Sequence, residues 1–220
     1  MGLAFLFANV LPADGFPSVT EGYPSPFGPA AEIERFFAEN REEVRALSAT
    51  LALMALSLLV FSASIVRALR EVVSGRGLAL TVALGGGVLA SAFVMMSAIL
   101  TWTLPRPQML GETAVLRAVH DLTYLAGGPA HVLFVSVFLG AASVAMLPTP
   151  TVPRWVIWVG IAGAALSVFA VVAMFWQPAT YILPASRVFL GAWILGLCLT
   201  MVEARLARAF RRREAAPQPG

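Results

Sequence analysis

Six polar residues between positions 106 and 187 of this 220-residue chain could act together at a binding site. Their guanidinium, imidazole and carboxylate groups can bind anions, exchange protons or pair with one another. We predict that they lie toward the same end of the fold and form a candidate ligand-binding cluster. The six residues are Arg106, Arg117, His120, Asp121, His131 and Arg187.

The spacing of these residues limits the chemistry that they could perform. Arg117 and Asp121 are four residues apart, so they can pair on one face of a helix. His120 points about 100° away from Asp121, so the two do not automatically form a dyad. His120 and His131 would share a helix face but stand about 16 Å apart along its axis, too far to bind one iron.

The sequence contains no stronger pattern for a metal, a cofactor or catalysis. A catalytic zinc site commonly has three protein ligands, and Asp121 and Glu112 are the only carboxylates near the histidines in sequence. A glycine-rich phosphate loop, a nucleophile elbow and a histidine–glutamate metal motif are all missing. We therefore predict no catalytic residue, no metal and no cofactor, and an enzyme is the minority interpretation.

Five long apolar runs between Val44 and Leu206 determine the predicted fold class. Hydrophobic residues make up 59% of the chain and charged residues 12%, against about 45–50% and about 25% in soluble domains. About 20 apolar residues are enough to cross a hydrocarbon core of roughly 30 Å. We expect an all-α, polytopic transmembrane bundle of five full spans, preceded by a short N-terminal apolar segment and an amphipathic interfacial helix.

Proline, glycine and charged residues predict the limits of these elements. The spans are expected at about 41–72, 77–104, 113–146 and 153–176, and from 184 into the basic tail. Residues 1–43 would hold the N-terminal segment (Leu3–Leu11, too short to span), a loop and the interfacial helix. Residues 44–206 would form the bundle and 207–220 the tail. Asn40 with Glu43 could cap a separate first span, but one continuous helix from Ala30 fits equally well.

Gly127, Gly128 and Pro129 interrupt the third span, and proline kinks or breaks helices. We therefore predict two parts, the first at the interface and the second crossing. His131 would lie roughly 22 Å from the end at Met146. At that depth its ring needs a partner, for which a backbone carbonyl freed by Pro129 is the simplest choice.

The distribution of arginine predicts the orientation of the bundle. All fifteen basic residues are arginines, a habit that suggests a bacterial protein. They concentrate in the turns after spans one and three and in the tail, which favours a cytoplasmic C-terminus and an outer N-terminal loop in a bacterial inner membrane. The tail arginines indicate anionic lipid headgroups as partners and no nucleic acid.

Small residues recur at four-residue spacing within the spans, as in packed membrane helices. They predict a compact monomeric bundle, or a homo-oligomer that uses one of these faces. The pairs and triplets are Ala83, Gly87 and Ser91; Ser136 and Gly140; Gly160 and Ala164; Gly163 and Ser167; and Ala192 and Gly196.

Two segments resemble a group of uncharacterised bacterial multi-span integral membrane proteins, classed as a domain of unknown function. They are the run AEIERFFAENR from Ala31 to Arg41, which leads into a span, and the turn Leu147–Trp158, in which Pro153-Arg154-Trp155 precedes Gly160. The resemblance would cover nearly the whole chain. Such proteins usually have about one more N-terminal span, so Leu3–Leu11 would be the remnant of it. The resemblance brings no activity and no site residues.

Three functions remain open from the sequence. The leading one is a non-catalytic accessory or structural membrane protein, or one that binds a small apolar or lipid-like ligand. The second is a small oligomeric transporter or channel subunit with a gate at Pro129 and a proton-sensing His131. The third is a membrane enzyme that acts on lipid headgroups through His120, Asp121 and Arg187.

Overall fold

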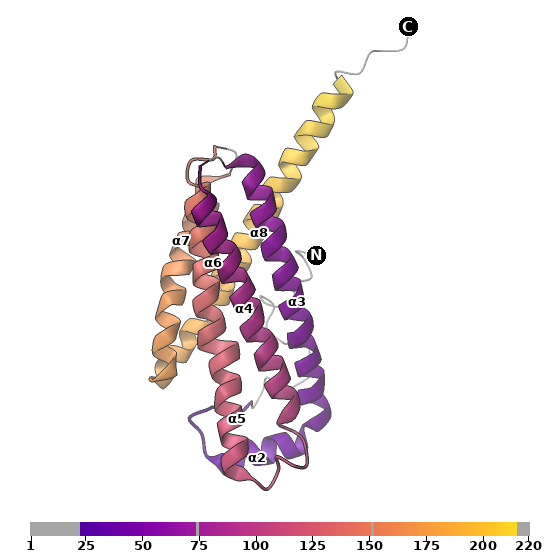
Figure 1. Ribbon diagram of the computed structural model, residues 1–220, viewed down its shortest axis with the longest axis vertical. Helices are drawn as coiled ribbons and strands as arrows, with labels where there is room; N and C mark the ends of the chain where they lie inside the picture. The colour runs from indigo at the N-terminus through magenta and orange to yellow at the C-terminus, as the bar shows by residue number, and fades with distance from the viewer. Residues whose placement is uncertain (1–22, 74, 151, 215–220) are drawn as a thin grey trace.

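The chain folds into a bundle of long helices that run up and down beside one another (Figure 1). The computed structural model describes residues 23–73, 75–150 and 152–214, with side chains up to residue 200. Five helical segments in this part are long and apolar enough to cross a membrane, with lengths of 31, 27, 34, 21 and 24 residues. The predicted all-α, five-span fold is therefore confirmed. The Leu3–Leu11 segment and the side chains of the arginine tail lie outside the described residues.

The helices follow the predicted order along the chain. They are α2 (Ala30–Glu39), α3 (Arg41–Val72), α4 (Gly77–Thr103), α5 (Thr113–Leu125), α6 (His131–Met146), α7 (Arg154–Val168) and α8 (Ile182–Glu214). A π-helical turn, η2 (Ala126–Ala130), joins α5 to α6, and two 3₁₀ helices, η3 (Phe169–Met174) and η4 (Gln177–Tyr181), join α7 to α8.

The first two described helices are separate, as one of the two interpretations of the sequence required. Asn40 interrupts them with φ −111° and ψ 39°. Asn40 is the N-cap residue of α3, as predicted, but its side chain makes no capping hydrogen bond there. Its Nδ2 donates instead to the Phe36 carbonyl at 2.9 Å. Asn40 therefore ends α2. The helix α2 itself crosses the end of the bundle beneath α5 (Figure 1).

The interruption of the third span takes a different form from the predicted break. α5, η2 and α6 follow one another without a gap and count as one 34-residue apolar segment. Pro129 lies inside the π turn. The His131 N–H reaches back five residues to the Ala126 carbonyl, and this wider loop accommodates the missing proline N–H without a sharp kink. The structure thus has two helical parts, α5 and α6, joined end to end through the π turn. The interfacial position of the first part stays a prediction.

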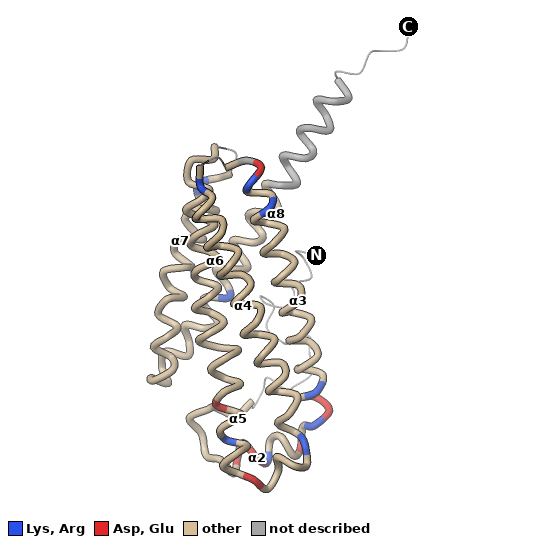
Figure 2. Tube along the Cα trace, viewed as in Figure 1, with Lys and Arg blue, Asp and Glu red and all other residues tan. Residues whose placement is uncertain are grey.

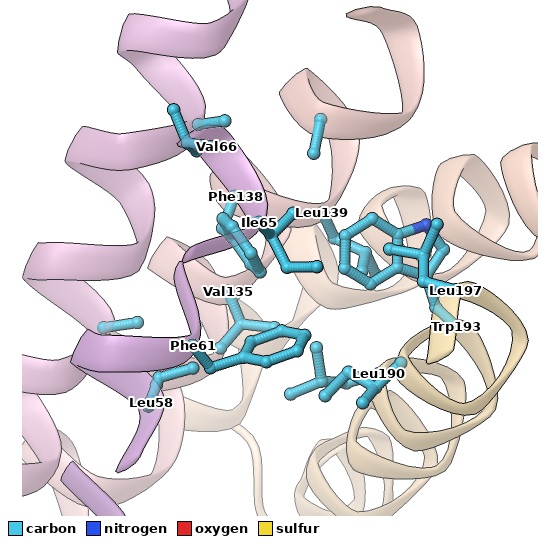
Figure 3. Close-up of a cluster of buried hydrophobic side chains, with 14 of the residues drawn as sticks. Leu58, Phe61, Ile65, Val66, Val135, Phe138, Leu139, Leu190, Trp193 and Leu197 are labelled. Carbon is cyan, nitrogen blue, oxygen red and sulfur yellow. The ribbon is translucent and has the colours of Figure 1, made fainter. Parts of the chain in front are cut away.

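Aromatic and aliphatic side chains from α3, α6 and α8 fill the centre of the bundle (Figure 3). Trp193 and Phe138 are both fully buried, and their ring centroids lie 5.6 Å apart in an edge-to-face arrangement. Phe61 packs its ring against Phe138 from the other side at 6.3 Å. Trp193 therefore belongs to the core of the bundle.

Small residues bring the helices into close contact, as their spacing predicted. A Cβ atom on Gly86 would lie 2.6 Å from the backbone nitrogen of Phe138, and one on Gly87 would lie 2.4 Å from the Ser62 hydroxyl. Gly160 approaches Ser143 and Trp193 in the same way. Ala192 differs from the other members of these pairs because its side chain is exposed. Most of these faces are thus used within the chain.

Charged residues gather at α2 and at the opposite turns, with a largely uncharged middle between them (Figure 2). On α3 the positions between Arg45 and Arg67 carry no charge, a length of about 33 Å at 1.5 Å per residue. That length matches the hydrocarbon thickness of a bilayer, roughly 30 Å. The chain is a multi-pass membrane protein.

Candidate functional site

The structure separates the six candidate residues into three places. Arg117, His120 and Asp121 lie together on α5 at the α2 end of the bundle. His131 and Arg187 belong to a second site at the π turn. Arg106 stands apart from both, with its guanidinium carbon 3.7 Å from the centre of the Trp102 ring.

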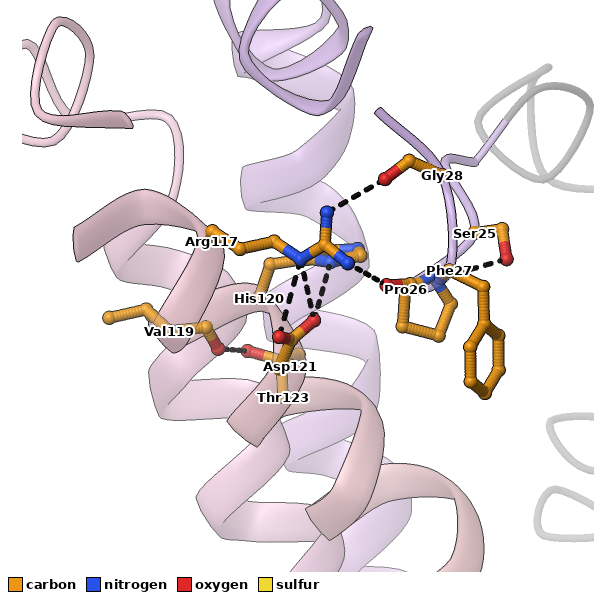
Figure 4. Close-up of polar contacts among 9 residues, drawn as sticks. All are labelled: Ser25, Pro26, Phe27, Gly28, Arg117, Val119, His120, Asp121 and Thr123. Atoms are coloured by element: carbon orange, nitrogen blue, oxygen red, sulfur yellow. Dashed lines mark hydrogen bonds and ion pairs between the residues drawn. The ribbon is translucent and has the colours of Figure 1, made fainter. Parts of the chain in front are cut away.

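Arg117 holds the loop before α2 against α5 (Figure 4). Its Nε pairs with the Asp121 carboxylate at 3.2 Å, the pairing that their four-residue spacing predicted. Its two terminal nitrogens donate to the carbonyls of Gly28, at 2.7 Å, and Pro26. Arg117 thus contacts a carboxylate on its own helix and two backbone carbonyls of the loop. We interpret these contacts as a latch that holds the loop against α5.

His120 lies behind this latch, among aromatic rings. It is 1% exposed, stacks on Tyr23 with centroids 5.8 Å apart, and meets the edge of Phe37. Its Nδ1 is 3.9 Å from Asp121, too long for a hydrogen bond, so the two form no dyad. Burial also raises the pKa of the Tyr23 hydroxyl, which keeps that neighbour neutral.

Glu34 is a latch residue that the sequence analysis missed. Its carboxylate accepts hydrogen bonds from the Gly111 N–H at 2.8 Å and from the Thr113 hydroxyl at 2.9 Å. These bonds attach α2 to the start of α5, about eighty residues further along the chain. Since α2 carries several similar acidic residues, only the tertiary contact distinguishes Glu34 from them.

His131 is buried at the crossing of α6 and α4. Its Nδ1 lies 3.1 Å from the Ala90 carbonyl. A carbonyl can only accept, so Nδ1 carries the proton and donates it. The predicted partner, a carbonyl freed by Pro129, is thus replaced by one on the neighbouring helix. The other ring nitrogen, Nε2, is buried without a hydrogen-bond partner in the part of the chain that the structure describes.

Arg187 reaches the same π turn from α8. In an α-helix the His131 N–H would donate to the Gly127 carbonyl, four residues earlier. In the π turn this N–H donates to the Ala126 carbonyl instead. The Gly127 carbonyl instead lies 3.5 Å from the Arg187 Nη2, a weak hydrogen bond. The Arg187 Nε is buried without a partner among the described residues.

Two hydrogen bonds, one to α4 and one to η3, attach the end of α5 beside the π turn to the bundle. The Ser97 hydroxyl of α4 donates to the Thr123 carbonyl at 3.1 Å. The Tyr124 hydroxyl donates to the Ala173 carbonyl of η3 at 3.2 Å. The π turn is therefore held in place by helices on both sides, and Arg187 and His131 are presented by a rigid frame.

The depth of this site follows from the two helices that cross there. Ala90 is fourteen residues from Arg76, and His131 is fifteen from Met146, so both lie about 21–22 Å from the turn end of the bundle. Gly127 lies a turn further, at about 28 Å. In a hydrocarbon core of roughly 30 Å, the Arg187 guanidinium is therefore near the boundary with the headgroups.

A guanidinium at the π turn is chemically suited to binding an anion. In residues 23–200 no carboxylate lies within salt-bridge distance of Arg187, and no three His, Cys, Asp or Glu side chains are grouped to hold a metal. A comparison with protein-family models, with curated proteins and with solved structures finds no match to this chain.

Proposed function

We propose that this protein is a non-catalytic, multi-pass membrane protein that binds a lipid-like amphiphile at the π turn of its third span. The observation that carries the proposal is the position of two polar residues, Arg187 and His131, at that turn: Arg187 Nη2 lies 3.5 Å from the Gly127 carbonyl, and His131 directly follows the turn. Each has a buried nitrogen without a partner among the described residues. Because buried polar groups are normally hydrogen-bonded, a ligand that completes these bonds is favoured.

The surroundings of the two residues favour a ligand that comes from the bilayer. Val132, Ala170 and Leu183 form an apolar cluster at this level, and Val188, next to Arg187, is 57% exposed. An acyl chain beside Val188 would remain in hydrocarbon, while the polar head reached Arg187 near the headgroup boundary. A freely soluble ligand would use none of this apolar surface.

The same proposal includes the location and orientation of the protein. Nine of the fifteen arginines lie at the end of α3 and in the turn after it, at the start of α7, and beyond residue 200. This asymmetry supports a bacterial inner membrane with these parts in the cytoplasm and α2 outside. Membership of the group of bacterial multi-span proteins with a domain of unknown function fits this arrangement. Small-residue faces remain the proposed contact of any homo-oligomer.

Binding can be tested on the purified protein in an uncharged detergent. We expect the melting temperature to rise saturably with at least one added membrane amphiphile. This rise in melting temperature should be smaller in His131→Ala. It should persist in His120→Ala, the control, which removes a buried histidine outside the π turn. Gradient-driven solute uptake by proteoliposomes, at rates well above those of protein-free vesicles, would contradict a non-transporting role and favour the oligomeric transporter.

A further inference from the structure

We infer that the head of this ligand is an anionic phosphate that carries a neighbouring hydroxyl group, as in a phosphatidylglycerol-like lipid. The inference rests on the proposed function and adds the chemistry that Arg187 and His131 would recognise. Its three parts are the missing counter-charge of Arg187, the free hydrogen-bond donors of its guanidinium and the protonation pattern of the His131 ring.

The charge of Arg187 requires a counter-ion in this position. A guanidinium stays protonated in proteins, and a charge near the bilayer interior normally pairs with an opposite charge. Within the described chain Arg187 has a weak bond to the Gly127 carbonyl and no carboxylate. An anion from the lipid would supply the pairing that the helices do not.

The geometry of the guanidinium favours an oxyanion with two acceptor atoms. Arg187 has five N–H donors in a planar fork, and a long bond to Gly127 uses one of them. Its Nε–H is buried without a partner among the residues described. Nε and a terminal nitrogen together match two oxygens of a phosphate or carboxylate, the arrangement in which arginine binds most strongly.

His131 adds a requirement for a hydroxyl group. Because its Nδ1 donates to the Ala90 carbonyl, Nε2 of the neutral ring has a lone pair and accepts a hydrogen bond. A phosphodiester oxygen cannot donate to it, but a glycerol hydroxyl can. Both residues border the same π turn, Arg187 through the Gly127 carbonyl and His131 through its backbone N–H to the Ala126 carbonyl, so the proposed head group would serve both.

The alternative ligand is a phosphate ion that is free in solution and not part of a lipid. The depth of the site, inside the span and near the headgroup boundary, favours the lipid. A soluble phosphate would need only the guanidinium, and its binding would not depend on an acyl chain.

The test measures the melting temperature of the detergent-purified full chain with four additives: phosphatidylglycerol, phosphatidylethanol, diacylglycerol and inorganic phosphate. Phosphatidylethanol has the phosphodiester without the glycerol hydroxyls, and diacylglycerol has a hydroxyl without the anion. We expect phosphatidylglycerol to give the largest shift. Arg187→Gln should weaken its apparent affinity at least about tenfold, the effect of losing a charge-assisted hydrogen bond.

Two controls separate recognition from folding. Arg106→Gln removes an arginine at the same end of the bundle that stacks on Trp102, and it should keep the full response to phosphatidylglycerol. Arg187→Gln without lipid should melt no lower than the parent, because it removes an unpaired charge. If Arg187→Gln does not fold, Arg187→Lys, which keeps the charge and loses the fork, should still show a reduced shift.

Each of the following results would refute a different part of the proposal. An unchanged phosphatidylglycerol response in Arg187→Gln, or a diacylglycerol shift as large as that of phosphatidylglycerol, would refute the anion and leave amphiphile binding intact. An equal response to phosphatidylethanol would remove the hydroxyl contact of His131. An Arg187-dependent shift with inorganic phosphate alone would assign the site to a soluble anion. No response to any amphiphile would end the proposed function itself.

Discussion

Arg117 connects two parts of the chain that are about ninety residues apart. Its pairing with Asp121 is local and follows from helix geometry, so the spacing of the two residues predicts it. Its bonds to the carbonyls of Pro26 and Gly28 are not local. Neither carbonyl is distinguishable in sequence from that of any other loop residue. The sequence therefore identifies the ion pair but not the latch.

Replacement of Arg117 by glutamine should loosen the loop before α2. The variant loses the ion pair and both carbonyl bonds, and hydrogen bonds to charged groups each contribute about 1.5–3 kcal/mol. We expect faster amide hydrogen exchange in residues 25–29 and a lower melting temperature. Arg45→Gln is the control, since Arg45 has only an exposed pair with Glu42 at 3.6 Å, and such pairs are worth about 0–1 kcal/mol. Equal exchange in the two variants would refute the latch.

The contact between α4 and α6 depends on which of three consecutive glycines faces the neighbouring helix. Gly85 has no atom within 4 Å of a built Cβ, whereas Gly86 would meet the backbone of Phe138 and Phe134 at 2.6 and 3.0 Å. The sequence predicted packing for Gly87 of this triplet, through its four-residue spacing from Ala83 and Ser91. It could not assign the positions, because an uncharged span has no polar face to orient it.

Replacing Gly85 or Gly86 by alanine, one at a time, should have different effects on stability. Gly86→Ala forces backbone apart, and overpacking of this kind costs about 1–3 kcal/mol. Gly85→Ala adds a methyl group in open space, so it should leave the unfolding transition unchanged or raise it slightly. Thermal unfolding of both variants in the same detergent provides the comparison. A loss at Gly85 equal to that at Gly86 would show that the helices cross differently.

The third span shows why a proline-containing segment is hard to predict. Gly127, Gly128 and Pro129 correctly indicate an irregular backbone, and two of the candidate residues do lie beside it. Whether such a segment breaks, kinks or widens into a π turn depends on the neighbouring helices that satisfy its carbonyls. Here Ser97 and Arg187 bond to carbonyls of this segment from α4 and α8.

The bundle as a whole has one charged end formed by α2 and the α4–α5 loop and another formed by the opposite turns. If the arginine-rich turns are cytoplasmic, a thiol in the α4–α5 loop should face outward. In a Cys198→Ala background, Gln108→Cys should react with an impermeant maleimide on intact cells. Pro150→Cys, in the α6–α7 turn, should react only after the membrane is opened. The reverse pattern would invert the proposed orientation.

The amino-acid sequence determines the number of spans, their approximate limits and the Arg117–Asp121 pair. These follow from the length and charge of apolar runs and from helix periodicity, which are properties of neighbouring residues. The tertiary structure decides that Arg187 and His131 border the same π turn, that Arg117 forms a latch and that His120 is buried behind it. It also decides which glycine is packed. The reason is physical: in an apolar helix most faces look alike to the sequence, and only the crossing helices determine which side chains end up together.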